Sequence, residues 1–166
     1  MEVKIKKLDE NAVIPTYARE GDAGLDLTAT KTWEDEYGNI VYGTGLAFAI
    51  PKGYVGLLFP RSSNAKTNLT LTNSVGVLDS GYRGEVLFKF KPIHNTMSRL
   101  RYWWQGTILK KDPMTVPVDT IACNRYNVGD RIGQIVIVKH PHITFVESDD
   151  LGETDRGAGG YGSTGK

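Results

Sequence analysis

The sequence predicts an all-β protein, folded as a jelly-roll-like, distorted barrel. Short runs of alternating or β-branched hydrophobic residues recur along the chain, turn residues separate them, and no window of about twelve residues keeps a helical period. Many short strands at a spacing of about 8–12 residues are typical of a sandwich or barrel. A chain of 166 residues suits one domain. We therefore expect residues 1–166 to form a single β domain.

The strand predictions rest on alternation and on short β-branched or aromatic runs. Val3 and Ile5 alternate with lysines, and comparable patterns lie at residues 46–50, 54–59, 86–90 and 132–138. Turn residues occupy positions 37–39, 51–53, 80–82 and 127–130. One or two helical turns are expected over residues 62–67, where Ser62 and Ser63 could cap the helix.

Two segments depart from the strand pattern. Residues 92–127 contain adjacent tryptophans, Trp103 and Trp104, among arginines and prolines, and we interpret them as an insert. Such residues either dock another protein or pin the insert to its own barrel. The glycine-rich tail, residues 153–166, has too little apolar surface to become ordered alone, so we expect it to be flexible. Its backbone amides either wrap phosphates or remain solvated.

Composition limits the function classes. The formal net charge is +1, so there is no global basic field, and nucleic-acid binding is not expected. The single cysteine, Cys123, cannot form an intramolecular disulfide. No apolar run approaches the ~20 residues that span a bilayer, and the N-terminus lacks the apolar core of a signal peptide. We expect a cytoplasmic protein of a bacterium or an infected host cell.

Four polar positions allow a structural or a functional interpretation. Asp26 follows a glycine turn and either holds a metal-bound water or caps that turn. Arg61, before two serines, suits a phosphate-binding corner or an ion-paired N-terminal cap. Asp79 lies in a tight hairpin, where a lone Asp usually forms an Asx turn. Gln134, in an apolar strand, is a core hydrogen-bonding residue or a ligand contact.

Taken in order, five segments resemble the five motifs of the homotrimeric dUTPase family. They are Ala-Gly-Leu-Asp-Leu at 23–27, Pro-Arg-Ser-Ser at 60–63, Gly-Val-Leu-Asp-Ser-Gly-Tyr-Arg-Gly at 76–84, Gly-Asp-Arg-Ile-Gly-Gln at 129–134, and Arg-Gly-Ala-Gly-Gly-Tyr-Gly-Ser-Thr-Gly at 156–165. The long stretch between the third and fourth motifs resembles the extra segment of some bacteriophage dUTPases.

This resemblance implies a dUTP diphosphatase that hydrolyses dUTP to dUMP and pyrophosphate with Mg²⁺. Such an enzyme keeps uracil out of DNA and supplies dUMP for thymidylate synthesis. Each active site would form at subunit interfaces of a homotrimer. Asp79 resembles the general base for water attack on the α-phosphorus, and Asp26 resembles the residue that supports the metal through water, without a direct protein ligand.

The resemblance also assigns the substrate contacts. Those for the base and sugar are Asn73, Gly76, Val77, Leu78, Tyr82 and Tyr161, the last in place of the usual Phe. Those for the phosphates are Arg61, Ser62, Ser63, Gln134, Arg156, Gly160, Gly162, Ser163 and Thr164. The tail, residues 153–166, would close over the substrate as a lid.

Two alternatives belong to other functional classes. A dCTP deaminase shares the fold and the trimer, but it carries a catalytic Glu where this chain has Lys89. A regulatory protein would bind a protein partner through the insert and use dUTP as a switch. A nucleic-acid-binding module is disfavoured, because aromatic and basic residues coincide only in the insert.

Overall fold

The computed structural model describes residues 1–93 and 125–160. Most of the insert predicted at 92–127, with Trp103 and Trp104, and the last residues of the predicted lid lie outside these described residues. The described part is all-β apart from one 3-10 helix, which confirms the predicted fold class. None of the helices in it is long and apolar enough to cross a membrane.

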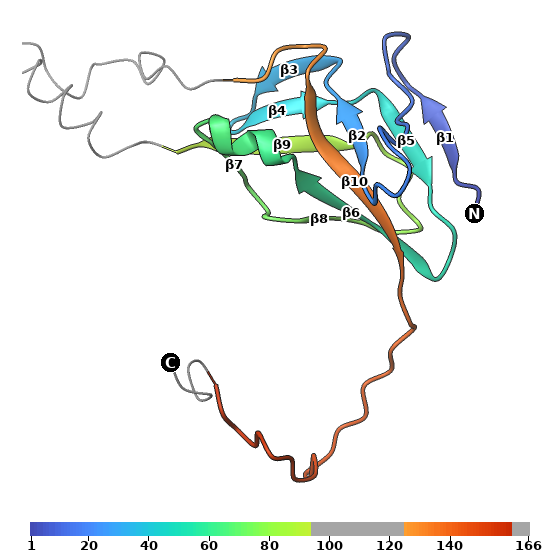
Figure 1. The fold of residues 1–166 in the computed structure, drawn as a ribbon, viewed down its shortest axis with the longest axis vertical. Coiled ribbons are helices and arrows are strands. Elements are labelled where there is room, and N and C mark those ends of the chain that lie inside the picture. Colours follow the sequence, from blue (N-terminus) through green and yellow to red (C-terminus); the bar gives the residue numbers. More distant parts are fainter. Residues whose placement is uncertain (94–124, 161–166) are drawn as a thin grey trace, which may run out of the picture.

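Two antiparallel four-stranded sheets and one two-stranded ribbon form the domain (Figure 1). The first sheet has the order β2 (Leu25–Thr28), β10 (Arg131–Lys139), β6 (Tyr54–Pro60), β8 (Gly76–Leu78). The second has the order β3 (Lys31–Glu34), β4 (Ile40–Gly43), β9 (Leu87–Pro92), β7 (Leu69–Leu71). The ribbon pairs β1 (Lys4–Lys7) with β5 (Leu46–Ala49), and the helix η1 (Ser62–Lys66) follows β6.

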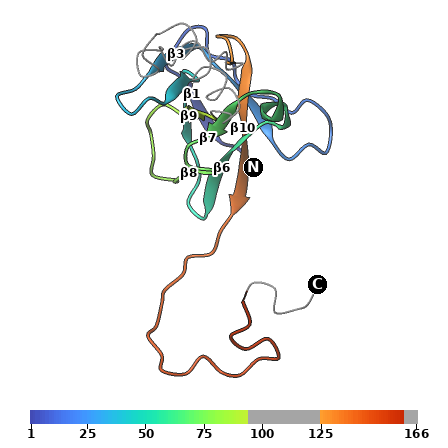
Figure 2. The ribbon, with the colours of Figure 1, turned by 90° about the vertical axis from the view of Figure 1, so that its left-hand side faces the viewer.

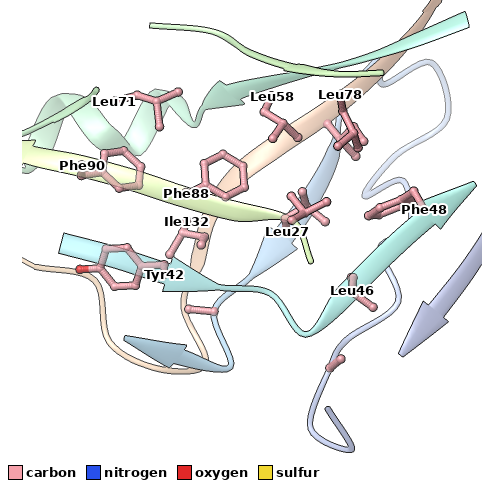
Figure 3. Packing of buried hydrophobic residues seen from close by; sticks show 14 of the residues in the cluster. Leu27, Tyr42, Leu46, Phe48, Leu58, Leu71, Leu78, Phe88, Phe90 and Ile132 are labelled. Carbon is pink, nitrogen blue, oxygen red and sulfur yellow. The ribbon is translucent and has the colours of Figure 1, made fainter. Parts of the chain in front are cut away.

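The core lies between the two four-stranded sheets (Figure 3). Leu27 and Ile132 come from the first sheet, and Tyr42, Phe88 and Phe90 come from the second; all are at most 1% exposed. Alternation explains this burial, because every second side chain of β9 faces the same layer.

One close approach joins the two sheets. The Phe88 ring packs so tightly against Gly133 of β10 that a Cβ atom at this position would overlap the ring. Only glycine therefore fits at this point of the predicted fourth motif.

Five strands confirm the predictions from the sequence. β1, β5, β6, β9 and β10 lie where alternation or a short β-branched or aromatic run placed them, whereas β2, β3, β4 and β7 were not predicted. The helical turn is also present, as η1, but the prediction of its capping is wrong. Arg61 occupies the N-cap position with extended backbone, and no side chain caps the helix.

After β10 the chain leaves the barrel. The His140 N–H donates to the Gly53 carbonyl at 2.9 Å, and the segment from residue 141 to 160 then extends away from the two sheets (Figures 1 and 2). Apolar side chains on this segment face solvent, with Phe145 93% and Leu151 94% exposed. The extended segment therefore begins before the lid predicted at 153–166.

Candidate active site

The predicted site residues form two groups at opposite ends of one sheet. β8 pairs antiparallel with β6, and Leu78 lies opposite Gly56. Continuing this register puts Asp79 beside the start of β6, whereas Arg61 follows the last residue of β6. Six residues of strand separate these ends, which is about 20 Å at ~3.3 Å per residue. A single chain therefore does not bring Asp79 and Arg61 together.

The first group, which we call the β6 corner, consists of Asp26, Arg61, Ser63, Arg131 and Gln134. Asp26 accepts a hydrogen bond from Arg61 Nε at 2.8 Å on one carboxylate oxygen and from Arg131 Nη1 at 3.0 Å on the other. Arg61 also reaches the Ser63 hydroxyl, at 3.4 Å. The Arg61 and Asp26 side chains are 25% and 22% exposed. The corner is thus a half-buried ion-pair network at the surface of the sheet.

Sheet register places the members of the β6 corner. Asp26 of β2 lies directly opposite Gln134 of β10, and Gly133 lies opposite Pro60 at the end of β6. The Gln134 amide donates to the Pro60 carbonyl at 3.4 Å. Gln134 is half-buried, and its amide lies at the β6 corner.

Helix η1 is held in place by polar contacts beneath the two serines. The Asn64 amide donates to the Leu69 carbonyl at 2.9 Å, and the Tyr126 hydroxyl donates to Asn64 Oδ1 at 3.2 Å. Burial raises the pKa of Tyr126, so its phenol is a neutral donor at physiological pH. Ser62 is exposed and Ser63 half-buried above this anchor.

The second group is the hairpin of residues 73–84, which contains β8. Gly76 and Leu78 are buried, whereas Val77 is 65% exposed between them. Among the described strands, β8 has a neighbour on one side only, namely β6. Its outer edge therefore presents backbone donors and acceptors to whatever lies beside it. This edge includes the predicted base contacts.

The tip of this hairpin is a tight turn, closed by a hydrogen bond from the Tyr82 N–H to the Asp79 carbonyl at 3.1 Å. The Tyr82 hydroxyl donates to the Glu85 carbonyl at 3.0 Å, and the ring lies over Gly84, where a Cβ atom would overlap it. Asp79 is exposed, and no hydrogen bond or ion pair of its carboxylate is found within residues 1–93 and 125–160. Asp79 therefore does not form the Asx turn that the sequence allowed, and its carboxylate is open to a substrate or water.

The tail residues lie apart from both groups. Arg156 and Gly160 belong to the extended segment, and Arg156 Nε donates to the Gly159 carbonyl at 3.1 Å. The other predicted tail contacts fall outside the described residues: Tyr161, Gly162, Ser163 and Thr164. Within one chain, neither the β6 corner nor the hairpin receives Arg156.

A directly ligated metal has no ready site in the described part of the chain. No group of three or more His, Cys, Asp or Glu side chains is placed there to hold an ion. Each Asp26 oxygen already accepts from an arginine, although a carboxylate has further lone pairs for a water. A hydrated Mg²⁺ carried by substrate phosphates fits these residues, because Mg²⁺ usually retains several waters.

Arg131 is a member of the β6 corner that the sequence pattern did not single out as a site residue. It lies beside Asp130 in the predicted fourth motif, but its partner, Asp26, is 105 positions away in sequence. The signal that could have found it is the pairing of β10 with β2, which joins the first and fourth motifs.

Comparisons with known proteins agree on one family. The profile of the family described as dUTPase matches residues 10–97 and 107–165. A deoxyuridine 5'-triphosphate nucleotidohydrolase of Nocardia farcinica is 37% identical over 165 residues, which cover 98% of this chain and 85% of the relative. That of Thermobifida fusca is 39% identical over 98% of this chain and 78% of the relative.

Solved structures give the same result. A mutant of the Staphylococcus bacteriophage 80alpha dUTPase with dUpNHpp has a TM-score of 0.73 and 26% identity, covering 99% of both chains. A mutant of the dUTPase from phage phi11 of S. aureus, described for its structural Mg(II) ion, has a TM-score of 0.65 and 25% identity over 91% of this chain and 99% of that one.

Proposed function

This chain belongs to the dUTPase family and is a dUTP diphosphatase, and we propose that its active site forms between subunits of a homotrimer. In this arrangement the hairpin of one subunit, with Asp79, faces the β6 corner of a second. The tail of a third subunit closes over them. The observation that carries the proposal is the separation of these motifs within one chain, by about 20 Å of strand.

The chemistry follows from what each group offers. Asp79 has a carboxylate open to solvent, and as a general base it would orient and deprotonate a water for attack on the α-phosphorus. A new oxygen–phosphorus bond forms there, the bond to the bridging oxygen breaks, and pyrophosphate leaves. Arg61, Ser63 and Gln134 would stabilise the charge on the phosphate oxygens, as would Ser62, which is exposed beside them.

Arg61 has two tasks in this proposal. Its Nε donates a hydrogen bond to Asp26, and its Nη1 donates one to the Ser63 hydroxyl. One guanidinium therefore holds both a carboxylate and a hydroxyl in place. The Asp26 carboxylate would bind a water of hydrated Mg²⁺ through its remaining lone pairs. When bound to the triphosphate, Mg²⁺ would neutralise part of the charge on the pyrophosphate group.

Base selection would come from the outer edge of β8. Backbone groups of Gly76, Val77 and Leu78 at an open strand edge match the alternating donors and acceptors of uracil. A dCTP base would leave such groups mismatched, and an unpaired buried polar group costs about 1–3 kcal/mol. Tyr82, fixed over Gly84, would fill the space of a ribose 2'-hydroxyl. Asn73 would add a contact to the base, directly or through water.

Residues 1–166 would form a single dUTPase domain, with the tail over 153–166 as its lid. Arg156 and Gly160 would contact phosphates, together with Gly162, Ser163 and Thr164, and Tyr161 would stack on uracil. Support comes from the exposed, extended course of the chain between residues 141 and 160. Arg156 and Gly157 bond to residues only three positions away, and a segment with such local hydrogen bonds is suited to closing after substrate binds.

A second role, as a regulator with a protein partner at the insert of residues 92–127, has one favouring observation. Phage dUTPases, among them that of Staphylococcus bacteriophage 80alpha, control transfer of virulence genes by a proto-oncogenic G protein-like mechanism. Deleting residues 97–122 should preserve dUTP hydrolysis while it abolishes binding of such a partner. The deaminase alternative is not favoured, because Lys89 stands where a deaminase carries its catalytic Glu, and it pairs with Asp35 of the turn after β3, at 3.0 Å.

The assignment of the base is tested by Asp79→Asn, which keeps the shape of the side chain. Turnover of dUTP should fall about 10²–10⁴-fold, as expected for a lost general base. The trimer, measured by size-exclusion chromatography with light scattering, should remain. Pyrophosphate release from dUTP, dCTP, dTTP and UTP, with ammonia assayed in parallel, should give product from dUTP alone. Near-normal turnover of Asp79→Asn would reject its role.

A further inference from the structure

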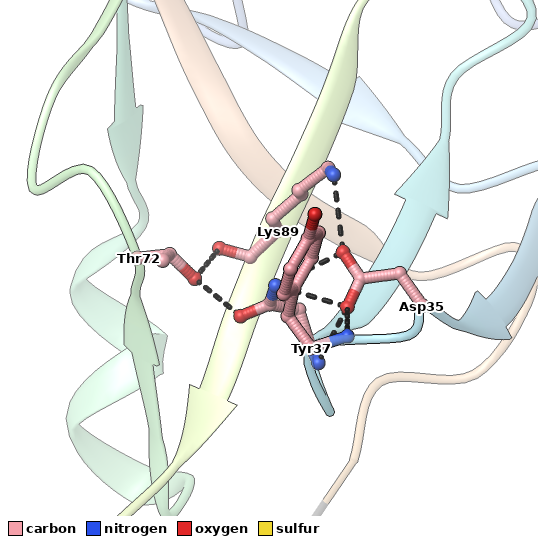
Figure 4. Close-up of polar contacts among 5 residues, drawn as sticks. Asp35, Tyr37, Thr72 and Lys89 are labelled. Atoms are coloured by element: carbon pink, nitrogen blue, oxygen red, sulfur yellow. Dashed lines mark hydrogen bonds and ion pairs between the residues drawn. The ribbon is translucent and has the colours of Figure 1, made fainter.

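A polar network on the second sheet lies next to the hairpin that the proposed function assigns to the base. We call it the Asp35 network: Asp35, Asn39, Thr72 and Lys89 (Figure 4). Asp35 accepts from the Asn39 amide at 2.9 and 3.0 Å, from the Asn39 N–H at 2.9 Å, and from Lys89 Nζ at 3.0 Å. Its side chain is only 14% exposed, and Asn39 is 5% exposed.

The carboxylate fixes which way the Asn39 amide points. Both Asp35 oxygens accept from Asn39 Nδ2, so Oδ1 must face the other way, toward Thr72. Thr72 Oγ1 lies 3.2 Å from this oxygen and 2.9 Å from the Lys89 carbonyl, which also accepts from the Thr72 N–H at 2.9 Å. Side chain and backbone of Thr72 are thus both tied to the second sheet.

Thr72 is the residue directly before the base-binding hairpin. Residues 71–74 form a turn closed by a hydrogen bond from the Ser74 N–H to the Leu71 carbonyl at 3.1 Å. Ser74 has a φ of 60°, the one positive φ of a residue other than glycine in the described part of the chain. A non-glycine residue in this conformation persists when its surroundings hold it there. Thr72 and Asn73 are the central residues of this turn.

We propose that the Asp35 network positions the uracil-binding hairpin, with Asn39 and Thr72 as its positioning residues. This inference rests on the proposed function, which assigns Asn73 and β8 to the base. The network sets the direction in which the chain enters β8, and therefore where Asn73 and the edge of β8 meet the substrate. Loosening the contact between Asn39 and Thr72 should weaken binding in the ground state and the transition state alike, which raises KM and leaves kcat nearly unchanged.

The test compares three variants by steady-state kinetics with dUTP and by calorimetric titration with dUpNHpp. Thr72→Val keeps the shape but removes the hydroxyl, and KM and Kd should rise about fivefold to tenfold, the size expected for one lost hydrogen bond. Thr72→Ser restores the hydroxyl and should stay within about twofold of wild type. Lys89→Met breaks the ion pair but spares the Asn39 path, so it should lower Tm without changing KM.

The outcomes separate this inference from the proposed function. A wild-type enzyme without dUTP hydrolysis, or an Asn73→Ala variant with wild-type KM and Kd, would overturn the base assignment and the inference together. If Asn73→Ala raises KM while Thr72→Val matches wild type, the positioning role alone is wrong. Equal rises in KM for Thr72→Val and Lys89→Met would also overturn it, because a general loss of stability would then explain both.

Discussion

Removal of the Arg61 guanidinium tests the β6 corner as a unit. Arg61→Met keeps much of the apolar stem but leaves Asp26 with one partner, Arg131, whose side chain is 55% exposed. Breaking a fully buried ion pair costs about 3–5 kcal/mol, whereas an exposed pair contributes about 0–1 kcal/mol. The Arg61–Asp26 pair is about one-quarter exposed, so we expect a loss of about 2 kcal/mol in the free energy of unfolding.

Arg131→Met is the matched control for this change. Its ion pair joins the same carboxylate at 3.0 Å but from an exposed position, so the expected loss is about 0.5 kcal/mol. Urea unfolding at one protein concentration measures both variants, because dissociation of an oligomer contributes to the apparent stability. The double variant with Asp26→Asn should show coupling between Asp26 and Arg61. Equal stability losses for the two arginine variants would refute this account of the corner.

The same reasoning gives further expectations, each with its own measurement. Removing the chain from Gly157 onward should abolish most dUTP hydrolysis yet change Tm little, and a large fall in Tm would make the tail structural. Asn39 and Lys89 hold the pKa of the Asp35 carboxyl well below its usual range, so ionised Asp35 stabilises the fold fully above about pH 4 and less as the pH falls below that value. The stability advantage of wild type over Asp35→Asn should therefore shrink between pH 6 and pH 2, and a constant difference would contradict the sign. Gly84→Ala should displace the Tyr82 ring and reduce discrimination between dUTP and UTP about tenfold in kcat/KM, whereas unchanged discrimination would exclude that ring as the ribose filter.

The sequence predicted the parts of the fold that have a local signal. β6, β9 and β10 are long enough for alternation or β-branched runs to be visible, and five ordered motifs identified the family. β2, β3 and β4 have only four residues each, and two of them pair with strands far along the chain, β2 with β10 and β4 with β9. Propensity alone therefore missed three of the four strands of the second sheet.

The site shows the same division between local and distant information. Asp79 and Arg61 were found from their motifs, whereas their separation along β6 follows only from the register of β6 with β8. The Arg131–Asp26 pair and the contact of Asn39 with Thr72 join positions far apart in sequence. Side-chain contacts of this kind have no local pattern, and so only the structure reveals them.

Mixing two inactive variants tests the shared active site most directly. Asp79→Asn disables the hairpin, and Arg61→Met with Ser63→Ala disables the β6 corner; neither variant alone should hydrolyse dUTP appreciably. If hairpin and corner come from different subunits, equal amounts unfolded and refolded together should recover about a quarter of the wild-type activity, because random assembly pairs two intact halves that often. Activity that stays at the level of the separate variants, in trimers shown to contain both chains, would contradict an active site assembled between subunits.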